Sequence, residues 1–369
     1  MSCILGIGMV SSTGCGVDSL RAALDGSTSP HVVHASVPSV SPECKLAVHK
    51  PTLEGLERFI PSRALRRTDN LTRMALLSSF LAVENSGLTL EDKSRVGIAF
   101  GTAYGPLQTT FHYQDTIIDE GDQGASPTLF ANSVHGAPAS TVSILMQITG
   151  PSVTLTTFER TTAEVLRTAE LWLAEGRVDY VLAGMGDEYC PVLGYAIHRL
   201  STGPSSTIDA RCVDRRPCSP GEGFVVFLLG NPTAGGRYGR IREITCVDCP
   251  SQLDAGNLAS HRAVFLCAHG GSGCARTYRK ADLASAAVAC YSPLYGSMPL
   301  GLAFDLAVAG VSLHDGRLYP TRESRIDLPC RLLVGGGELS DTDSIACLEC
   351  SPTSTTLISL RGSAPSTDC

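Results

Sequence analysis

The residues best placed to do chemistry lie in a turn between a strand and a helix. Residues 150–157 read Gly-Pro-Ser-Val-Thr-Leu-Thr-Thr, which favours a strand, and Thr161 and Thr162 supply hydroxyl groups near a helix start. Such a turn is a common place for a nucleophile, because the helix N-terminus offers backbone N–H groups and a partial positive charge. Here the turn carries Glu159 and neither cysteine nor serine. The chemistry of this turn therefore depends on what a carboxylate can do there.

Two further elements must position the turn. A helix is predicted after it, because apolar residues recur there at helical spacing, and Gly176 ends that helix. The apolar residues are Val165, Leu166, Ala169, Trp172 and Leu173. Residues 178–184 then read as a second buried strand, so the turn lies inside a strand–helix–strand unit.

Strands and helices alternate along the rest of the chain. Residues 31–60 read as a surface excursion and 190–220 as a loop-rich stretch. Further strands are predicted at 4–10, 96–102, 224–229, 241–246, 263–267, 332–337 and 344–348. Helices are predicted up to Gly26, up to Ser86 (amphipathic), over 107–118 and 139–147, and from near Leu300. A composition change at 230–236 separates two similar halves, residues 1–230 and 231–369, of a layered α/β protein.

The composition excludes several classes of function. The net charge is -7 and no run of lysine and arginine is present to neutralise phosphates, so nucleic acid is not expected as a partner. No apolar stretch reaches the roughly 20 residues that a membrane span needs. The first residues lack the basic segment and long apolar core of a signal peptide. We therefore expect a globular protein in the cytoplasm, without a membrane span.

The fifteen cysteines are expected to be buried thiols. The chain is neither small nor predicted to be exported, which argues against a disulfide framework. Two Cys-x-x-Cys pairs, Cys246/Cys249 and Cys347/Cys350, could in principle form a four-thiolate zinc site. Both pairs lie in strand-like runs and lack the Gly-rich turn of such sites, so neither a metal nor another cofactor is expected.

Several segments of the chain carry recognisable motifs. They are ILGIGMVSSTGCGVDSLRAALDG, RALRRTDNLTRMAL, VGIAFGTAYG, SPTLFANSVHGAPAS, GPSVTLTT, VDYVLAGMGDE, SPGEGFVVFLL and AHGGSG. In collinear order over most of residues 3–320, they resemble the β-ketoacyl synthases of the thiolase superfamily. The resemblance implies a five-layered αβαβα thiolase-like fold made of two similar halves. It also implies a dimer in which the strand before the nucleophile lies near the subunit interface.

The resemblance also implies which residues stand at the catalytic positions. Active condensing enzymes of this family use a cysteine thiolate at the helix N-terminus and two histidines. Matching GPSVTLTTFER to the family's GPS-x-x-x-x-T-A-C places Glu159 at the cysteine, and AHGGSG keeps His269 at the first histidine. The nearest match to the second histidine motif places Met298 at that histidine, and the Gly-Phe-Gly-Gly loop is matched only by residues 335–337. The nucleophile, a proton donor and the closing loop thus depart from the family pattern together.

Glu159 is not expected to replace the cysteine. A carboxylate is a poor nucleophile toward a thioester, and the mixed anhydride that it would form is unstable in water. Glu159 can instead cap the helix N-terminus and satisfy its unpaired N–H groups. Condensation by this chain alone is therefore not expected.

One subfamily has this profile, the chain-length factors of type II polyketide synthases, which keep the fold and lose the cysteine. The resemblance to them implies that this chain forms a heterodimer with a catalytic ketosynthase, or a heterotetramer built from two such heterodimers. It also implies that an acyl carrier protein delivers substrate to the complex. Residues 126–138 and 152–157 are then expected to face the partner and to bound the tunnel in which a polyketide or polyene grows. The candidate interface and tunnel residues are Thr128, Leu129, Phe130, Asn132, Thr154 and Thr156, with ordinary packing an equal alternative for Phe130.

Other functions were weighed against this hypothesis. The main alternative is a malonyl-acyl carrier protein decarboxylase, since ketosynthase-like proteins with glutamine for cysteine use the oxyanion hole and a histidine for that reaction. His269 favours it, whereas the charge of Glu159 and the loss of a donor at Met298 oppose it. A serine hydrolase is excluded because the chain has no Gly-x-Ser-x-Gly motif. The basic cluster at 63–67 could dock an acidic carrier, although a solvated helix face is the commoner meaning of such a cluster.

Overall fold

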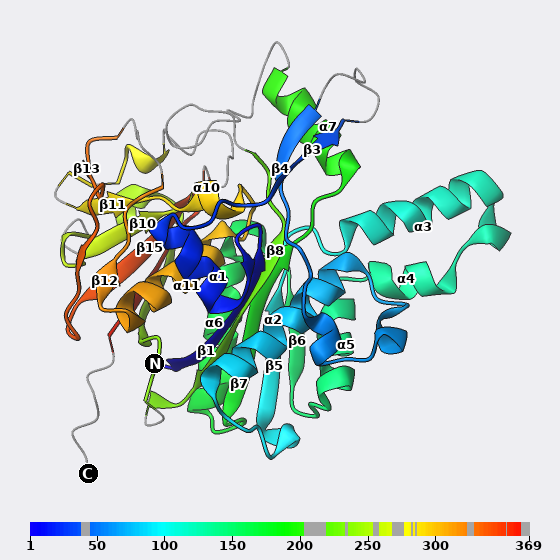
Figure 1. Cartoon of the computed structure of the whole chain (residues 1–369), viewed down its shortest axis with the longest axis horizontal. Coiled ribbons are helices and arrows are strands. Elements are labelled where there is room, and N and C mark those ends of the chain that lie inside the picture. The colour runs from blue at the N-terminus through cyan, green and yellow to red at the C-terminus, as the bar shows by residue number, and fades with distance from the viewer. Residues whose placement is uncertain are drawn as a thin grey trace.

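The main strands of the N-terminal half form one side of a continuous sheet (Figure 1). The computed structural model describes residues 1–37, 45–202, 219–232, 235–253, 258–267, 277–281, 283–284, 286–322, 328–351 and 353–362. In this half-sheet the strand order is β1-β8-β7-β5-β6, with β5, β6 and β7 parallel and β8 antiparallel to both its neighbours. The strands are β1 (Cys3–Ser11), β5 (Val96–Gly101), β6 (Ser152–Leu155), β7 (Tyr180–Asp187) and β8 (Gly223–Gly230), and β2 (Gly14–Cys15) folds back on β1.

The C-terminal half repeats this arrangement. Its order is β9-β16-β15-β10-β11, again with three parallel strands at one end and two antiparallel pairs at the other. These strands are β9 (Arg240–Val247), β10 (Ala263–Leu266), β11 (Ala287–Ala289), β15 (Ser344–Cys350) and β16 (Thr355–Arg361). The short strand β13 (Arg331–Leu332) extends the sheet beyond β11, and one pair between Cys3 and Arg240 joins the half-sheets. The predicted fold of two similar halves is confirmed.

Two helices lie between the half-sheets. They are α6 (Thr161–Ala174) and α11 (Gly301–His314), and both contribute to the core that the two halves share. All residues of α11 from Gly301 to Ser312 are buried, as is expected of a helix that lies between two layers. Successive strand residues alternate between this shared core and the outer cores, as the two-residue period of a strand requires.

The outer faces complete the five layers. Helices α2 (Asn70–Ser86) and α5 (Ala137–Met146) cover the N-terminal half-sheet, and α2 comes so close to β1 that a Cβ at Gly8 would lie 1.9 Å from the carbonyl oxygen of Ser78. Short segments around Leu258 and Tyr278 cover the C-terminal half-sheet. The αβαβα layering predicted from the resemblance is therefore present. Among the described residues, no helix is both long and apolar enough to cross a membrane.

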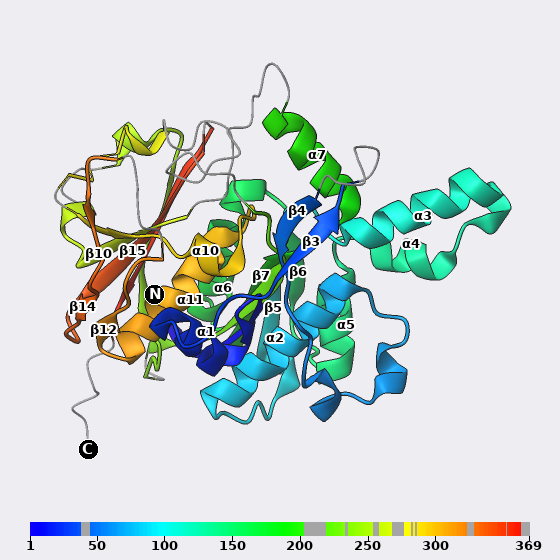
Figure 2. The ribbon, with the colours of Figure 1, turned by 45° about the horizontal axis from the view of Figure 1, so that its top comes forward.

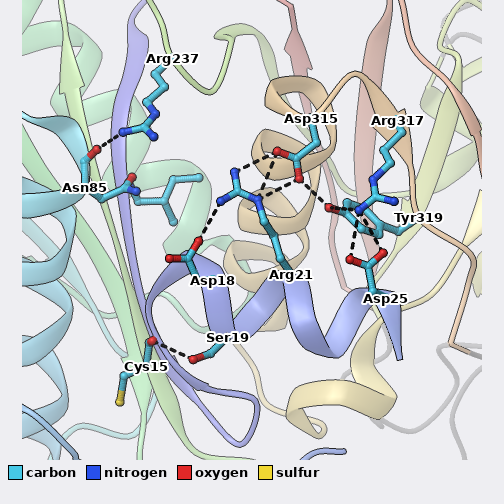
Figure 3. A network of polar contacts seen from close by, with 11 residues as sticks. Cys15, Asp18, Ser19, Arg21, Asp25, Asn85, Arg237, Asp315, Arg317 and Tyr319 are labelled. Atoms are coloured by element: carbon cyan, nitrogen blue, oxygen red, sulfur yellow. Dashed lines mark hydrogen bonds and ion pairs between the residues drawn. The ribbon is translucent and has the colours of Figure 1, made fainter. Parts of the chain in front are cut away.

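A polar network ties α1 (Gly16–Asp25) to the end of α11 (Figure 3). Arg21 donates hydrogen bonds to Asp315 from two nitrogens. Nε lies 2.9 Å from Oδ2, and Nη2 lies 2.9 Å from Oδ1. Asp315 also accepts a hydrogen bond of 2.5 Å from the hydroxyl of Tyr319, and Arg317 pairs with Asp25 at 3.0 Å. The network thus fastens the first helix of one half to the last long helix of the other.

Several sequence predictions about secondary structure are wrong. The stretch 31–60, predicted as a surface excursion, contains a partly exposed hairpin of β3 (Val32–Ser36) and β4 (Lys45–His49). The stretch 190–220, predicted as loop-rich, begins with the helix α7 (Pro191–Thr202), and its residues 203–218 lie outside the described residues. The helix α2 is buried on most sides rather than amphipathic, because α5 covers it as well as β1. Strand β16 was not predicted. The predicted strand 332–337 is not continuous: only its first residue belongs to β13, and only its last belongs to β14 (Gly337–Glu338). Strand β14 pairs with β12 (Arg317–Leu318).

Candidate functional site

The predicted strand–turn–helix is present and forms an elbow. Strand β6 ends at Leu155, a 3-10 turn spans Phe158–Arg160, and α6 begins at Thr161. The N–H of Thr157 donates to Oγ1 of the buried Thr161 over 2.8 Å, which closes the turn. Phe158 has a φ of 49°, in the left-handed region that costs a non-glycine residue about 1 kcal/mol. The elbow is thus a strained turn of the kind that holds a reactive residue in enzymes.

Glu159 occupies the tip of this elbow. It is half-buried and precedes the N-terminus of α6, where the helix dipole stabilises a negative charge. The guanidinium group of the next residue, Arg160, forms an ion pair with Asp248, with Nη2 2.8 Å from Oδ1. Glu159 lies close enough to two other groups to raise the pKa of each. The pKa of Tyr104 is raised mainly by burial, then by Asp187 and then by Glu159. The pKa of Glu349 is raised mainly by burial and then by Glu159. The elbow therefore presents an acid in acidic surroundings.

The acidic surroundings come from the core between the half-sheets. Asp305 on α11 accepts a hydrogen bond from the hydroxyl of Tyr295, and Cys267 lies 3.8 Å from Oε1 of Glu349 on β15. Burial raises the pKa of Asp305 to about 8. Burial, then Glu159, then Asp305 raise the pKa of Glu349 well above its usual range. Burial therefore favours the protonated form of both carboxyl groups.

A loop next to the elbow is held by a third buried carboxyl group. Asp187, at the end of β7, accepts hydrogen bonds from Oγ1 of Thr102 at 2.6 Å and from the N–H groups of Ala103 and Tyr104 at 3.0 and 2.9 Å. Burial raises the pKa of Asp187 to about 6 against the effect of these bonds. The loop in turn places the ring of Tyr104 edge-on against Phe158. This anchor was not predicted from the sequence, where the available signal was an acidic residue at the end of a buried strand.

The predicted interface residues fall into two groups. Thr154 lies on β6, the last strand of its half-sheet, and Thr156 directly follows the end of that strand. Both residues line a groove of about 510 Å³. The other lining residues are His135, Gly136, Ala139, Ser140, Ser152 and Val153. This groove brings the end of the 126–138 segment against the strand, as a shared interface would require.

The other candidates lie on α4 (Pro127–Ser133), a helix that the sequence analysis did not assign. Thr128 is exposed, Leu129 is half-buried, and Phe130 is 55% exposed with its ring 5.5 Å from that of Tyr113. The side-chain amide of Asn132 donates to the carbonyl oxygen of Arg67 over 2.6 Å, so this amide already has a partner within the chain. The structure therefore separates Phe130 on an open surface from Asn132 at a contact with the 63–67 segment.

The remaining candidates are dispersed. His269 lies outside the described residues. Met298 is 3% exposed in the shared core, with its Cε 3.0 Å from where a Cβ on Gly221 would stand. Residues 335–337 lie beside Leu318 at the small β12–β14 ribbon. Of the catalytic-position candidates in the described residues, only Glu159 stands at the elbow.

The candidate zinc ligands do not gather into a metal site. Cys347 and Cys350 are buried on β15, and Cys246 on β9 lies 3.8 Å from the hydroxyl of Thr356. Across the part of the chain that the structure describes, no group of three or more His, Cys, Asp or Glu side chains is arranged to hold a metal ion.

Comparison with known proteins adds the family. The family model described as "Beta-ketoacyl synthase, N-terminal domain" matches residues 41–230, which is more than half of the chain. The chain belongs to the β-ketoacyl synthase family. Among curated relatives, a 3-oxoacyl-[acyl-carrier-protein] synthase 2 of Vibrio cholerae is 25% identical over 38% of this chain and 34% of its own. A putative polyketide β-ketoacyl synthase 1 of Streptomyces halstedii is 31% identical over 37% of this chain and 33% of its own. The aligned region thus spans about a third of each of these relatives.

Solved structures agree with the fold over nearly the whole chain. The ishigamide ketosynthase/chain length factor superimposes with a TM-score of 0.79 at 17% identity, covering 98% of this chain and 99% of that one. A type II polyketide synthase acyl-carrier protein in complex with its ketosynthase gives 0.75 at 14% identity, with coverage of 98% and 99%. At these identities the likeness establishes the thiolase-like fold of this β-ketoacyl synthase family member.

Proposed function

We propose that this chain is a non-catalytic, chain-length-factor-like subunit of a type II polyketide synthase. The observation that carries the proposal is Glu159 at the tip of an elbow built for a cysteine. The fold, the elbow and the strand before it are retained, whereas the thiolate is replaced by a group that cannot form a stable acyl-enzyme. The chain then contributes shape to a complex whose chemistry is supplied by a catalytic ketosynthase and its acyl carrier protein.

The pairing with a ketosynthase is supported by the free edge of β6. In the described sheet, β6 is the terminal strand beside β5, and an unpaired edge invites another strand. Exposed apolar side chains lie in the segments next to it, namely Phe130, Val134, Ile144 and Phe158. An exposed edge with apolar neighbours favours burial against another protein. Thr154 and Thr156 would then lie at the interface, and Thr128, Leu129 and Phe130 beside the elongation tunnel.

A malonyl-acyl carrier protein decarboxylase is the weaker alternative. Its substrate brings a carboxylate to the elbow, where the carboxylate of Glu159 already lies. Like charges in a partly desolvated site repel strongly.

Co-expression with catalytic ketosynthases of type II polyketide synthases, followed by affinity purification and mass spectrometry, tests the proposal. We expect a stoichiometric complex and product formation only when both subunits and a loaded carrier protein are present. The chain alone should form no acyl-enzyme on incubation with acyl-carrier protein. Condensation by the isolated chain, or a stable monomer that binds no ketosynthase, would refute the proposal, and CO2 release from malonyl-carrier protein by the isolated chain would favour the alternative.

A further inference from the structure

Helices α3 (Leu107–Glu120) and α4 form an arm that projects from the body of the protein (Figures 1 and 2). The two helices pack on each other, with the Tyr113–Phe130 ring pair between them. The base of the arm is fastened on both sides: the N–H of Gln108 donates to Oε1 of Glu188 over 2.8 Å, and Asn132 bonds to the 63–67 segment. The arm, residues 107–133, is thus rigid at its base and extends away from the core.

The arm carries apolar side chains that nothing in the described chain covers fully. Ile118 near its tip is 79% exposed and Phe130 is 55% exposed. Of the residues of α3, only Thr109 is buried. The exposed surface continues from α4 through Val134 to the groove beside β6, which begins at His135. An exposed apolar surface that is continuous with an open sheet edge is typical of a protein–protein interface.

Between Arg95 and Arg160, the Asp and Glu side chains are not balanced by any lysine or arginine. This stretch includes the whole arm and β6. The arm instead carries exposed acids in and after the second half of α3: Asp115, Asp119, Glu120 and Asp122. A surface with this pattern fits a partner whose facing surface is basic.

These acids do not stabilise the helix that carries them. Asp119 and Glu120 lie in the last turn of α3, which contains no basic residue, so they oppose the helix dipole. Asp115 and Asp119 are four residues apart, and like charges at that spacing cost a few tenths of a kcal/mol. A favourable interaction outside the chain would offset this cost.

We propose that the arm docks on a basic surface of the partner ketosynthase, with Ile118 in the contact and the acidic tip of α3 selecting the partner by charge. The inference rests on the proposed function and adds the chemistry of the surface that the partner must present. A second copy of this chain is a poorer occupant, because each copy carries a net charge of -7 and two such chains repel. The arm thereby favours the heterodimer over self-association.

The test compares three variants in complexes with the co-expressed ketosynthase. An arm variant (Asp115→Asn, Asp119→Asn, Asp122→Asn) removes three charges from the tip. A control variant (Glu91→Gln, Glu175→Gln, Asp341→Asn) removes three exposed charges outside the arm. Ile118→Ser removes the apolar contact alone. Association rates and affinities are measured at about 50 mM and about 500 mM NaCl, where screening is weak and strong.

At low salt the arm variant should associate about tenfold more slowly than the unmodified chain, and its rate should change little with salt. The control should follow the unmodified chain. Ile118→Ser should dissociate faster at both salt concentrations without altering the salt dependence. If the unmodified chain binds and the arm variant binds equally well, only the arm inference fails. If no ketosynthase binds, the proposed function fails with it. Arm-dependent dimers of the chain alone, seen by sedimentation, would overturn the choice of partner.

Discussion

The ring of Phe158 meets the ring of Tyr104 edge-on, with centroids 5.8 Å apart and planes at 85°. The contact joins the elbow to the loop that Asp187 anchors, so the strained turn is held from outside as well as by its own hydrogen bond to Thr161. Tertiary contacts of this kind are what allow an unfavourable backbone conformation to persist. The elbow that presents Glu159 is therefore a property of the assembled half-sheet.

The strain at Phe158 can be measured by substitution. Phe158→Ala loses the contact with Tyr104 and keeps the strain, whereas Phe158→Gly loses the contact and relieves it. We expect the glycine variant to be about 1 kcal/mol more stable than the alanine variant in urea unfolding of the purified complex. At Ile144, an exposed position inside α5, the order should be reversed, because glycine weakens a helix by about 1 kcal/mol relative to alanine. Equal stability of the two Phe158 variants would show that the turn is not strained.

Glu159 should be dispensable for product formation. Glu159→Gln and Glu159→Ala are expected to change turnover by the complex less than about twofold, because the carboxylate neither attacks the thioester nor is needed as a base. Turnover is measured as polyketide formed per complex, with CO2 release from malonyl-carrier protein followed in parallel. A large fall in CO2 release on these substitutions would support the decarboxylase instead.

The buried carboxyl group of Asp305 should make the protein less stable as the pH rises. Its pKa is raised to about 8 in the folded chain, whereas the unfolded chain releases this proton near pH 4. Between these values the folded state binds more protons, so the free energy of unfolding falls with increasing pH. Between about pH 5 and pH 8 the unmodified protein should lose on the order of 2 kcal/mol of its free energy of unfolding through this group, and Asp305→Asn should not show this loss. The exposed control Glu91→Gln should keep the unmodified slope, and an unchanged slope in Asp305→Asn would contradict the assignment.

The grip of Arg21 on Asp315 should contribute to the coupling of the two halves. Arg21→Ala is expected to cost about 2 kcal/mol, because both partners are largely shielded from water and Asp315 would be left without its cation. Arg21→Lys should recover less than half of this, since an ammonium group cannot make the two-pronged contact. Thermal unfolding of the three chains measures the difference. Full recovery by lysine would mean that charge alone matters at this site.

Phe130 should affect the length of the product rather than the rate of its formation. It is 55% exposed on α4, so Phe130→Ala is tolerated by the fold while changing the surface offered to the tunnel. We expect a shift of product length with turnover retained, measured by mass spectrometry of products from the reconstituted complex. Leu171→Ala is a matched control, because Leu171 is also 55% exposed but lies on α6. An unaltered product in the Phe130 variant would remove this residue from the tunnel.

Much of the fold was predictable because the signals were local. Strand β1 and strand β8 are continuous apolar runs bounded by polar residues or glycine, and α1 ends at Gly26, which adopts the left-handed conformation expected of a helix cap. The hairpin β3–β4 and the helix α7 were missed, because each lies in a stretch of the sequence with several prolines that favours loops. Strand β16 follows β15 too closely to stand out by composition, and only its pairing with both β15 and β9 identifies it.

The sequence by itself determined that a strand, a turn and a helix present Glu159 where a nucleophile would stand, because strand and helix patterns extend over neighbouring residues. Only the tertiary structure decided what surrounds that turn. Asp305 and Glu349 are distant in sequence from each other and from the elbow, and the burial that raises their pKa values depends on two half-sheets closing over one core. The same holds for the arm, whose exposed acids and apolar residues acquire meaning from their position beside the open edge of β6. Burial and proximity depend on chain packing, which local sequence does not encode.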